Sequence, residues 1–337
     1  MQHARVPVRV KRVMAGKLRR YHNRTWAERL RDIETLVFNI RDIAFIIAGF
    51  LQSLIIIARF RPDVVFAKGG YVCLPLGLAT KLCRVPLVIH DSDTRPGLTN
   101  RVLARFARAI ATGSPLDNYH YPESRSHYTG VPIDAAFRPL TAAEQQQAKA
   151  DIGLIDTTAP LVVVTGGGLG ARSINDAIVK DAARLLDAGL HIYHVCGKLH
   201  HDAMLAGAPE HPHYHLVPFV YKDMHHVLGA ADLIVARGSA TFLQEMAAMA
   251  KPVIVVPSHL LGDQVKNAAM YDKAQAVRAL TDQEITASSA LCDTILSLMD
   301  DSTSRKHMSQ KLHQFAKPHA ASDLAHLLMD AYRGKTT

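Results

Sequence analysis

The sequence predicts an α/β protein built from two parallel-sheet domains. Short apolar runs alternate with helical stretches twice along the chain, first after Pro62 and again from about Leu161, which is the rhythm of βαβ units. A length of 337 residues suits two domains of ordinary size, each with its own core. Hydrophobic residues make up 48% of the chain and charged residues 20%, which excludes a disordered, collagen-like or polytopic membrane protein.

The first alternation is preceded by a basic segment and a long helix. Residues 5–13 alternate apolar and basic side chains, which predicts a strand with one solvated face. A helical stretch runs from about Trp26 to Phe60. Strands are then expected within 63–70, 86–93, 109–114 and 126–132.

The second alternation begins after a stretch that resembles a linker with one short helix. Apolar runs are found within 161–165, 191–198, 213–220, 231–236 and 252–258, and two helical stretches close the chain. The domains are therefore expected at 1–134 and 159–337, with a linker over 135–158. Both domains should bind ligands at the carboxyl ends of their strands.

The helix that ends at Phe60 contains an uncharged segment. Residues 43–58 carry no charge, but sixteen residues are fewer than the roughly 20 that span a bilayer, and Gln52 and Ser53 lie at the centre. A buried core helix, a helix lying in the membrane surface and a membrane span all remain open. One face of the same helix can pack on the core while the other meets lipid.

The charge is distributed unevenly. Residues 1–110 hold 20 Lys and Arg against 7 Asp and Glu, whereas the whole chain has a formal net charge of +9. An anionic partner is therefore expected on the N-terminal side: a membrane surface, a phosphate-bearing substrate or nucleic acid. The four cysteines fit no disulfide or zinc pattern, which favours a reducing cytosol, and the first 35 residues lack the apolar region of a signal peptide. Histidines cluster within 191–201, but their side chains should point in different directions, so no metal site is expected there.

The segment Thr165–Arg172, TGGGLGAR, lies between a predicted strand and a helix. Glycines let the backbone approach a phosphate closely, and the free N–H groups at a helix start meet the anion. A dinucleotide fingerprint would also need an acidic residue at the end of the next strand, and that strand ends in Cys196-Gly-Lys198. Phosphate binding is favoured over a plain tight turn, and a dinucleotide oxidoreductase is disfavoured.

Two more segments of the second domain follow predicted strands. Arg237 precedes small residues at a helix start, where its charge could neutralise a diphosphate, and Glu245 lies two turns further along to accept bonds from sugar hydroxyls. Gln264 and Asn267 are three residues apart on one helical face, so both amides could reach one ligand. The alternative for Arg237 and Glu245 is a surface ion pair, and the alternative for the two amides is ordinary solvation.

In the first domain, polar segments begin at Lys68 and at His90, each directly after a predicted strand. Asp91 and Asp93 form a DxD pair that could hold a divalent ion on a nucleotide. Such a triplet is common by chance, and its carboxylates need not converge.

Six motifs occur in a fixed order: GGYxxxP from Gly69, HxxxxxxGLTN from His90, TGGGLGAR, HxxGK from His194, Arg237 with Glu245, and DQxxNA from Asp263. In this order and spacing they resemble the peptidoglycan N-acetylglucosaminyltransferases that form lipid II, which are two-domain GT-B enzymes. The resemblance covers the chain from about Gly16 to the last helix.

The resemblance implies that the C-terminal domain binds UDP-GlcNAc. Glycines would lie near the diphosphate or uridine, Arg237 and Ala240 would contact phosphate, and Glu245 would bind the ribose hydroxyls. Gln264 would read the GlcNAc hydroxyls, and the backbone of Val220 the uracil. The implied donor-binding residues are Gly167, Gly168, Gly170, Arg172, Val220, Arg237, Ala240, Glu245, Gln264 and Asn267.

The resemblance also implies the acceptor and the reaction. Undecaprenyl-pyrophosphoryl-MurNAc-pentapeptide (lipid I) would bind at Gly69, Gly70, Tyr71, Asp93 and Asn100. Its 4-hydroxyl would displace UDP, inverting the α-linkage of the donor to a β-1,4 bond and giving lipid II in peptidoglycan synthesis. A general base must take the hydroxyl proton, and His90 and Asp91 are candidates. No cofactor and no tightly bound metal are implied.

The sequence departs from the family pattern at three places. The family's HEQN is His90-Asp-Ser-Asp93 here, and the serine of its GGYxSxP is Cys73. No Gly-rich loop ending in a histidine precedes Gly16, so the first domain is expected to lack its opening βα units. This departure keeps open an alternative, a donor-binding or scaffold subunit without activity alone.

The partners expected are UDP-GlcNAc, lipid I and an anionic membrane surface. The membrane contact would use the 43–60 helix and the basic N-terminal third, at the cytoplasmic face of the plasma membrane as a peripheral protein. No recognised nucleic-acid motif accompanies the basic charge, so no nucleic-acid partner is expected.

Overall fold

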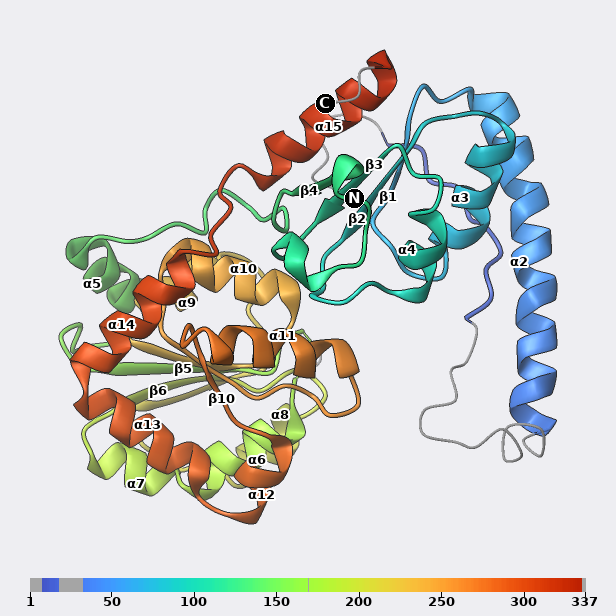
Figure 1. Ribbon diagram of the computed structural model, residues 1–337. Helices are drawn as coiled ribbons and strands as arrows, with labels where there is room; N and C mark the ends of the chain where they lie inside the picture. Colours follow the sequence, from blue (N-terminus) through green and yellow to red (C-terminus); the bar gives the residue numbers. More distant parts are fainter. Residues whose placement is uncertain (1–7, 18–32, 169, 335–337) are drawn as a thin grey trace. The chain divides into compact units, whose positions relative to one another are not determined.

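The computed structural model describes residues 8–17, 33–168 and 170–334, and these residues form two separate parallel sheets (Figure 1). One sheet has four strands in the order β1-β2-β3-β4, and the other has six in the order β10-β9-β8-β5-β6-β7. All strand pairs found among the described residues are parallel. The α/β class with two parallel-sheet domains is confirmed.

The chain divides into two compact units, one around each sheet. The second unit comprises Ser92–Arg95 and Thr129–Ala321, and the first takes the residues before Ser92, Pro96–Tyr128 and the chain from Ser322. These limits differ from the expected ones because the 135–158 stretch and the last helix each pack on a sheet rather than standing apart. Ala148 and Leu154, from the expected linker, are buried in the core of the second unit.

The first unit has four short strands flanked by helices. Its elements are α2 (Ile33–Phe60), β1 (Val65–Ala67), α3 (Cys73–Leu82), β2 (Leu87–Asp91), α4 (Leu98–Leu103), β3 (Ala109–Thr112), η1 (Leu116–Asn118), η2 (Glu123–Arg125), β4 (Ser126–Tyr128) and most of α15 (Ala320–Arg333). Strand β2 is buried along its whole length. On one face of the sheet, Leu324 and Leu327 of α15 pack against Val88 and Ala111.

The segment 8–17 forms no strand, so the predicted strand is wrong over 8–13; residues 5–7 lie outside the described residues. Instead the segment packs along α2. Met14 N–H donates to Gln52 Oε1 at 2.9 Å. A Cβ on Gly49 would lie 1.8 Å from the Met14 carbonyl oxygen, and one on Gly16 would lie 2.0 Å from that of Asp42, so both close approaches require glycine. The alternation of basic and apolar residues therefore reflects a segment that covers a helix and pairs with none of the described strands.

Helix α2 ends at Phe60, as predicted; the predicted start near Trp26 lies outside the described residues. One face packs on the unit, with Ser53 and Ile57 buried. The opposite face exposes an apolar row at intervals of three or four residues, each side chain at least half exposed: Ile40, Ile43, Ile47, Leu51 and Ile55. Val37–Phe60 is long and apolar enough to cross a membrane by length and composition. We call the five residues the apolar row of α2.

The second unit contains a six-stranded sheet with helices on both faces (Figure 1). Its elements are α5 (Ala142–Asp151), β5 (Leu161–Thr165), α6 (Arg172–Lys180), α7 (Ala182–Asp187), β6 (His191–Val195), α8 (His201–Leu205), β7 (Tyr214–Val217), α9 (Met224–Ala230), β8 (Leu233–Ala236), α10 (Ala240–Met249), β9 (Val253–Val255), α11 (Gly262–Lys273), β10 (Arg278–Ala279), α12 (Asp282–Ala287), α13 (Ala290–Asp300) and α14 (Ser302–His313).

Two hydrophobic cores lie on the two faces of this sheet. Val163 points into a core formed with α5, α9, α10 and α14, whereas its neighbours Val162 and Val164 point into a core formed with α6, α7, α12 and α13. Burial on both faces explains why β5, β8 and β9 are nearly continuous apolar runs without alternation. The sheet therefore presents rigid carboxyl ends from which the polar loops emerge.

Candidate functional site

Five polar loops of the second unit leave the carboxyl ends of its strands. They comprise residues 166–171 after β5, 196–200 after β6, 218–223 after β7, 237–239 after β8 and 256–261 after β9. Because all these strands are parallel, the loops meet at one edge of the sheet, where open α/β sheets bind their ligands. Nearly all of the donor-binding residues predicted from the sequence lie on these loops or on the helices that follow them.

The Gly-rich loop makes a tight turn into α6. Gly167 and Gly170 have φ of +80° and +78°, values that favour glycine, and the Gly167 N–H donates to Thr165 Oγ1 at 3.2 Å. A Cβ on Gly170 would lie 2.3 Å from the Cys196 carbonyl oxygen, so the loop is pressed against the end of β6. Ala171 at the N-cap supplies no side-chain bond, which leaves the first amides of α6 available to an anion. Arg172 has a largely exposed side chain 3.5 Å from Asp176.

Beside this loop, Lys198 lies over two aromatic rings. Its Nζ is 4.9 Å from the ring centroid of Phe219 and 4.3 Å from that of Tyr221. A Cβ on Gly168 would lie 3.9 Å from the Phe219 ring, so the Gly-rich loop and the loop after β7 are neighbours. Val220 packs on the core between the two aromatic residues. The edge thus holds two aromatic rings, steeply inclined to each other, and a lysine next to a phosphate-type turn.

His194 of the HxxGK motif lies inside the protein. Its Nδ1 is 2.8 Å from the Tyr214 hydroxyl and its Nε2 is 3.0 Å from Asn175 Oδ1. Burial lowers the pKa of His194 to about 4, so the ring is neutral at physiological pH. The motif therefore carries a structural histidine that ties β6 to β7 and α6. Among the described residues, no three His, Cys, Asp or Glu side chains come together as metal ligands.

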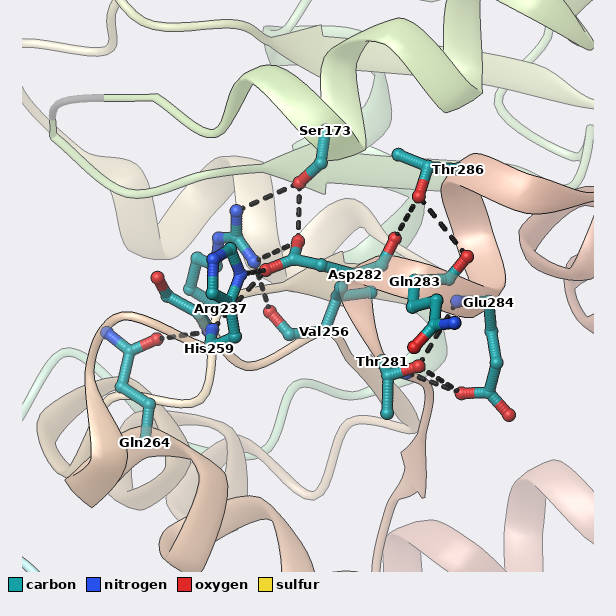
Figure 2. A network of polar contacts seen from close by, with 11 residues as sticks. Ser173, Arg237, Val256, His259, Gln264, Thr281, Asp282, Gln283, Glu284 and Thr286 are labelled. Carbon is teal, nitrogen blue, oxygen red and sulfur yellow. Dashed lines mark hydrogen bonds and ion pairs between the residues drawn. The ribbon is translucent and has the colours of Figure 1, made fainter. Parts of the chain in front are cut away.

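A network centred on Arg237 and Asp282 connects four of the segments at this edge (Figure 2). Arg237 donates to Asp282 Oδ1 at 2.8 Å, to Ser173 Oγ at 3.0 Å and to the Val256 carbonyl oxygen at 3.0 Å. Ser173 Oγ donates to the same carboxylate at 2.5 Å, and His259 Nδ1 lies 3.0 Å from Asp282 Oδ2. The network holds the start of α6, the ends of β8 and β9, and the start of α12.

The carboxylate at the centre is ionised. Burial alone would raise the pKa of Asp282, but hydrogen bonds from Ser173, His259 and Arg237 hold it at about 2. The guanidinium of Arg237 has five N–H groups, of which three bond to the residues named above. The other two N–H groups of Arg237 bond to none of the described residues, so they remain for a ligand.

Helix α10 begins directly after this network. Ser239 caps it by accepting from the Phe242 N–H at 3.3 Å, and Ala240 is its first residue. Further along, Glu245 is half-buried and forms no hydrogen bond or ion pair with any described residue. Burial raises the pKa of Glu245 to about 7. A half-buried carboxyl group without a protein partner is a common feature of ligand sites.

The two predicted amides of α11 differ in their surroundings. Gln264 is half-buried, and its Oε1 accepts from the Ser258 N–H at 3.1 Å. Asn267 is only 1% exposed; its Nδ2 donates to Asp93 Oδ1 at 2.9 Å and to the Gly238 carbonyl oxygen at 3.3 Å. Asn267 thus uses its amide within the second unit, to which the Ser92–Arg95 stretch belongs. Burial raises the pKa of the Asp93 carboxyl group, although the hydrogen bond from Asn267 acts to lower it.

In the first unit, the predicted acceptor residues gather at the carboxyl ends of β1 and β2. Gly69 and Gly70 have φ of +92° and +81°, and a Cβ on Gly69 would lie 3.0 Å from Asn100 Nδ2. That nitrogen donates to the His90 carbonyl oxygen at 3.2 Å, while Asn100 Oδ1 is buried without a partner among the described residues. Tyr71 follows the glycines and is exposed.

The two candidate bases lie at the end of β2. His90 has no exposed surface, and Asp91 is 5% exposed. Asp91 Oδ2 accepts from the Tyr121 hydroxyl at 2.8 Å, and burial together with this carboxylate raises the pKa of Tyr121. Burial also raises the pKa of the Cys73 thiol, whose Sγ lies 2.8 Å from the Gly69 carbonyl oxygen.

Sequence reasoning missed Ser173, His259 and Asp282. Ser173 directly follows TGGGLGAR, and Thr281 and Glu284 form a capping box that places Asp282 at the start of α12. These signals predict helix starts, but no spacing rule links them to Arg237.

The fold and this edge define a GT-B glycosyltransferase. Residues 31–112 match the glycosyltransferase family 28 N-terminal domain, and residues 161–324 match its C-terminal domain. The chain belongs, more narrowly, to the family of UDP-N-acetylglucosamine–N-acetylmuramyl-(pentapeptide) pyrophosphoryl-undecaprenol N-acetylglucosamine transferases.

Relatives support this membership, and a solved structure shares the fold. The transferase of Shouchella clausii (strain KSM-K16) is 34% identical over 277 residues, which is 81% of this chain and 72% of the relative. The transferase of Geobacillus kaustophilus (strain HTA426) is 31% identical over 277 residues, again 81% of this chain and 72% of the relative. A crystal structure of MurG from Acinetobacter baumannii is similar in fold, with a TM-score of 0.70, 22% identity, and coverage of 86% of this chain and 79% of that one.

Proposed function

We propose that this chain transfers GlcNAc from UDP-GlcNAc to lipid I, with inversion at the anomeric carbon, to give lipid II. The observation that carries the proposal is the order of the donor residues along one sheet edge. Val220 follows β7, the Gly-rich loop follows β5, Arg237 and Ala240 follow β8, and Gln264 follows β9. In the sheet order β9-β8-β5-β6-β7 this is the order of sugar, diphosphate and nucleobase in a nucleotide sugar.

The dimensions of the edge support this assignment. Four strand intervals separate β9 from β7, which is about 19 Å at the usual strand spacing. In the middle of that span, the first amides of α6 and α10 and the two remaining N–H groups of Arg237 would face the diphosphate. Such preorganised donors stabilise the negative charge that develops on the departing UDP.

Acceptor binding is proposed for the first domain, residues 1–134, at Gly69, Gly70, Tyr71 and Asn100. Positive φ at both glycines and the buried, unpartnered Asn100 Oδ1 support it. The second domain, residues 159–337, would bind the donor. A donor-binding subunit without activity is not favoured, because the relatives matched over most of this chain are transferases. Transfer of labelled GlcNAc to lipid I tests the proposal.

Glu245 would bind the ribose hydroxyls as an ionised acceptor. Since burial raises its pKa to about 7, the group is largely protonated at pH 6 and ionised at pH 8. Affinity for UDP-GlcNAc, whose diphosphate keeps its charge over this range, should therefore rise from pH 6 to pH 8. Glu245→Ala should weaken binding by about 1–3 kcal/mol, because polar partners are left unpaired. Titration calorimetry at both pH values measures these effects. Glu245→Gln should remove the pH dependence of the affinity. If the affinity of Glu245→Gln still changed between pH 6 and pH 8, the assignment would be contradicted.

The apolar row of α2 would dip into an anionic membrane surface, as a peripheral contact at the cytoplasmic face. Its exposure along one helical face and the basic N-terminal third support this. Binding to anionic vesicles should fall with added salt, and Ile47→Glu with Leu51→Glu should weaken it strongly. Vesicle sedimentation measures this. Ile155→Glu, which changes an isolated side chain that is 99% exposed, is the matched control and should have no effect. Equal binding by all three proteins would contradict the contact.

A further inference from the structure

The proposed donor contacts leave Lys198 of the HxxGK motif without a role. Lys198 lies in a short turn after β6, in which Gly197 has φ of +91° and its carbonyl oxygen accepts from the His200 N–H at 3.0 Å. The same turn is bonded to the helix that follows the Gly-rich loop, because Asn175 of α6 donates to the Cys196 carbonyl oxygen at 2.8 Å. The backbone that carries Lys198 is therefore tied to α6.

The ammonium group of Lys198 lies over two aromatic rings. The rings of Phe219 and Tyr221 are inclined by 75° to each other, and Lys198 Nζ lies 4.9 and 4.3 Å from their centroids. Lys198 forms no hydrogen bond or ion pair with any described residue, whereas Arg172 and Arg237 of the same edge each lie beside a carboxylate. Exposed rings hold a cation weakly, and a charge-assisted hydrogen bond to an anion is stronger. An anionic ligand can therefore replace the rings as the partner of this ammonium group.

Lys198 lies between the segments assigned to the diphosphate and to the nucleobase. Strand β6, which it follows, has β5 with the Gly-rich loop on one side and β7 with Val220 on the other. Phe219, which Lys198 contacts, also faces the Gly-rich loop, since a Cβ on Gly168 would lie 3.9 Å from its ring. Arg237 follows β8, on the opposite side of β5. In a nucleotide sugar the α-phosphate is bonded to the ribose and the β-phosphate to the sugar, so the order of the two cations matches the order of the two phosphates.

We propose that Lys198 is a donor-binding residue that binds the α-phosphate of UDP-GlcNAc, with Phe219 and Tyr221 as its positioning residues; this rests on the proposed function. When the nucleotide binds, the ammonium group donates hydrogen bonds to oxygens of the α-phosphate, and Arg237 binds the β-phosphate. The first amides of α6 face the anion between these two cations. Because the α-phosphate keeps its charge when the sugar is transferred, Lys198 should affect KM more than kcat.

Binding of UMP and UDP to the full chain, measured by titration calorimetry at pH 8, tests the contact. UMP carries only the α-phosphate, so Lys198→Gln should weaken both nucleotides by similar factors, at least about tenfold at low salt. The loss should shrink with added salt because the interaction is between charges. Lys198→Arg keeps the charge and should keep the affinity within about threefold. Lys180→Gln, at the other end of α6, is the matched control and should leave both affinities unchanged.

Tyr221→Leu tests the positioning role of the ring. The Tyr221 side chain is 74% exposed, so its replacement should leave the fold intact. The variant should weaken UMP about threefold, and it should cause no further loss when Lys198→Gln is already present, because the ring acts through the ammonium group. An equal loss in both backgrounds would make Tyr221 an independent contact and would reject its positioning role.

Three results would overturn the α-phosphate contact. Lys198→Gln that weakens UDP and leaves UMP unchanged would assign the ammonium group to the β-phosphate. A loss that does not change with salt would mean that Lys198 packs against the nucleobase. Affinities of Lys198→Gln equal to those of the wild type would reject the contact and leave the donor site intact. By contrast, a wild-type chain that binds neither UDP nor UDP-GlcNAc would reject the proposed function together with this contact.

Discussion

Gly170→Ala is expected to lower the affinity for UDP-GlcNAc at least about tenfold, or about 1.4 kcal/mol of binding free energy. Gly170 has φ of +78°, and a Cβ there would lie 2.3 Å from the Cys196 carbonyl oxygen and 2.7 Å from a ring carbon of His200. Relief of this overlap must move the Gly-rich loop away from β6. The amides at the start of α6 would then lose the positions in which they face the diphosphate. Titration calorimetry measures the loss.

Gly153→Ala is the control for backbone strain. Gly153 has φ of +93°, but no atom lies within 4 Å of a Cβ built on it. Alanine there should cost about 1 kcal/mol of folding free energy and leave donor affinity unchanged. If Gly170→Ala bound UDP-GlcNAc as tightly as Gly153→Ala does, the Gly-rich loop would not be the diphosphate site.

Asp282→Ala is expected to lower the free energy of unfolding by about 3 kcal/mol. The side chains of Arg237 and Asp282 are only 16% and 14% exposed, so removal of the carboxylate leaves a poorly solvated guanidinium without its counter-charge. Ser173 and His259 lose their acceptor in the same substitution. Urea unfolding followed by circular dichroism measures the difference.

Asp293→Ala is the matched comparison for this ion pair. Asp293 lies 2.9 Å from Arg184, but these side chains are 62% and 51% exposed. Water replaces the lost partner there, so the variant should cost less than about 1 kcal/mol. Equal losses for the two variants would show that the network of Figure 2 contributes no more than a surface ion pair.

Much of the fold could be predicted from the sequence because local patterns determine it. Strands such as Leu161–Thr165 are buried on both faces, which makes them short apolar runs between turns. The Gly-rich loop was recognisable because positive φ and close backbone approach both restrict residue choice at Gly170. The segment 8–13 was predicted wrongly because basic and apolar alternation also suits a segment that covers a helix.

The site could be predicted only in part, since its network joins residues that are distant in sequence. Asp282 is 109 residues from Ser173 and 45 from Arg237, and no periodicity connects them. Asn267 shows a second limit of prediction from the sequence. Its spacing from Gln264 predicted a shared ligand, but tertiary packing buries it and engages its amide with Gly238 and Asp93. Pattern therefore identifies which residues carry chemistry, whereas packing determines what each one contacts.

Transfer of radiolabelled GlcNAc from UDP-GlcNAc to lipid I by the purified chain tests the proposed function most directly. The expected result is label in a lipid product that comigrates with lipid II, with release of an equal amount of UDP. The transferase of Shouchella clausii serves as the positive control for the lipid substrate. A lipid fraction without label, from a chain that binds UDP-GlcNAc while the control reaction proceeds, would contradict the proposal.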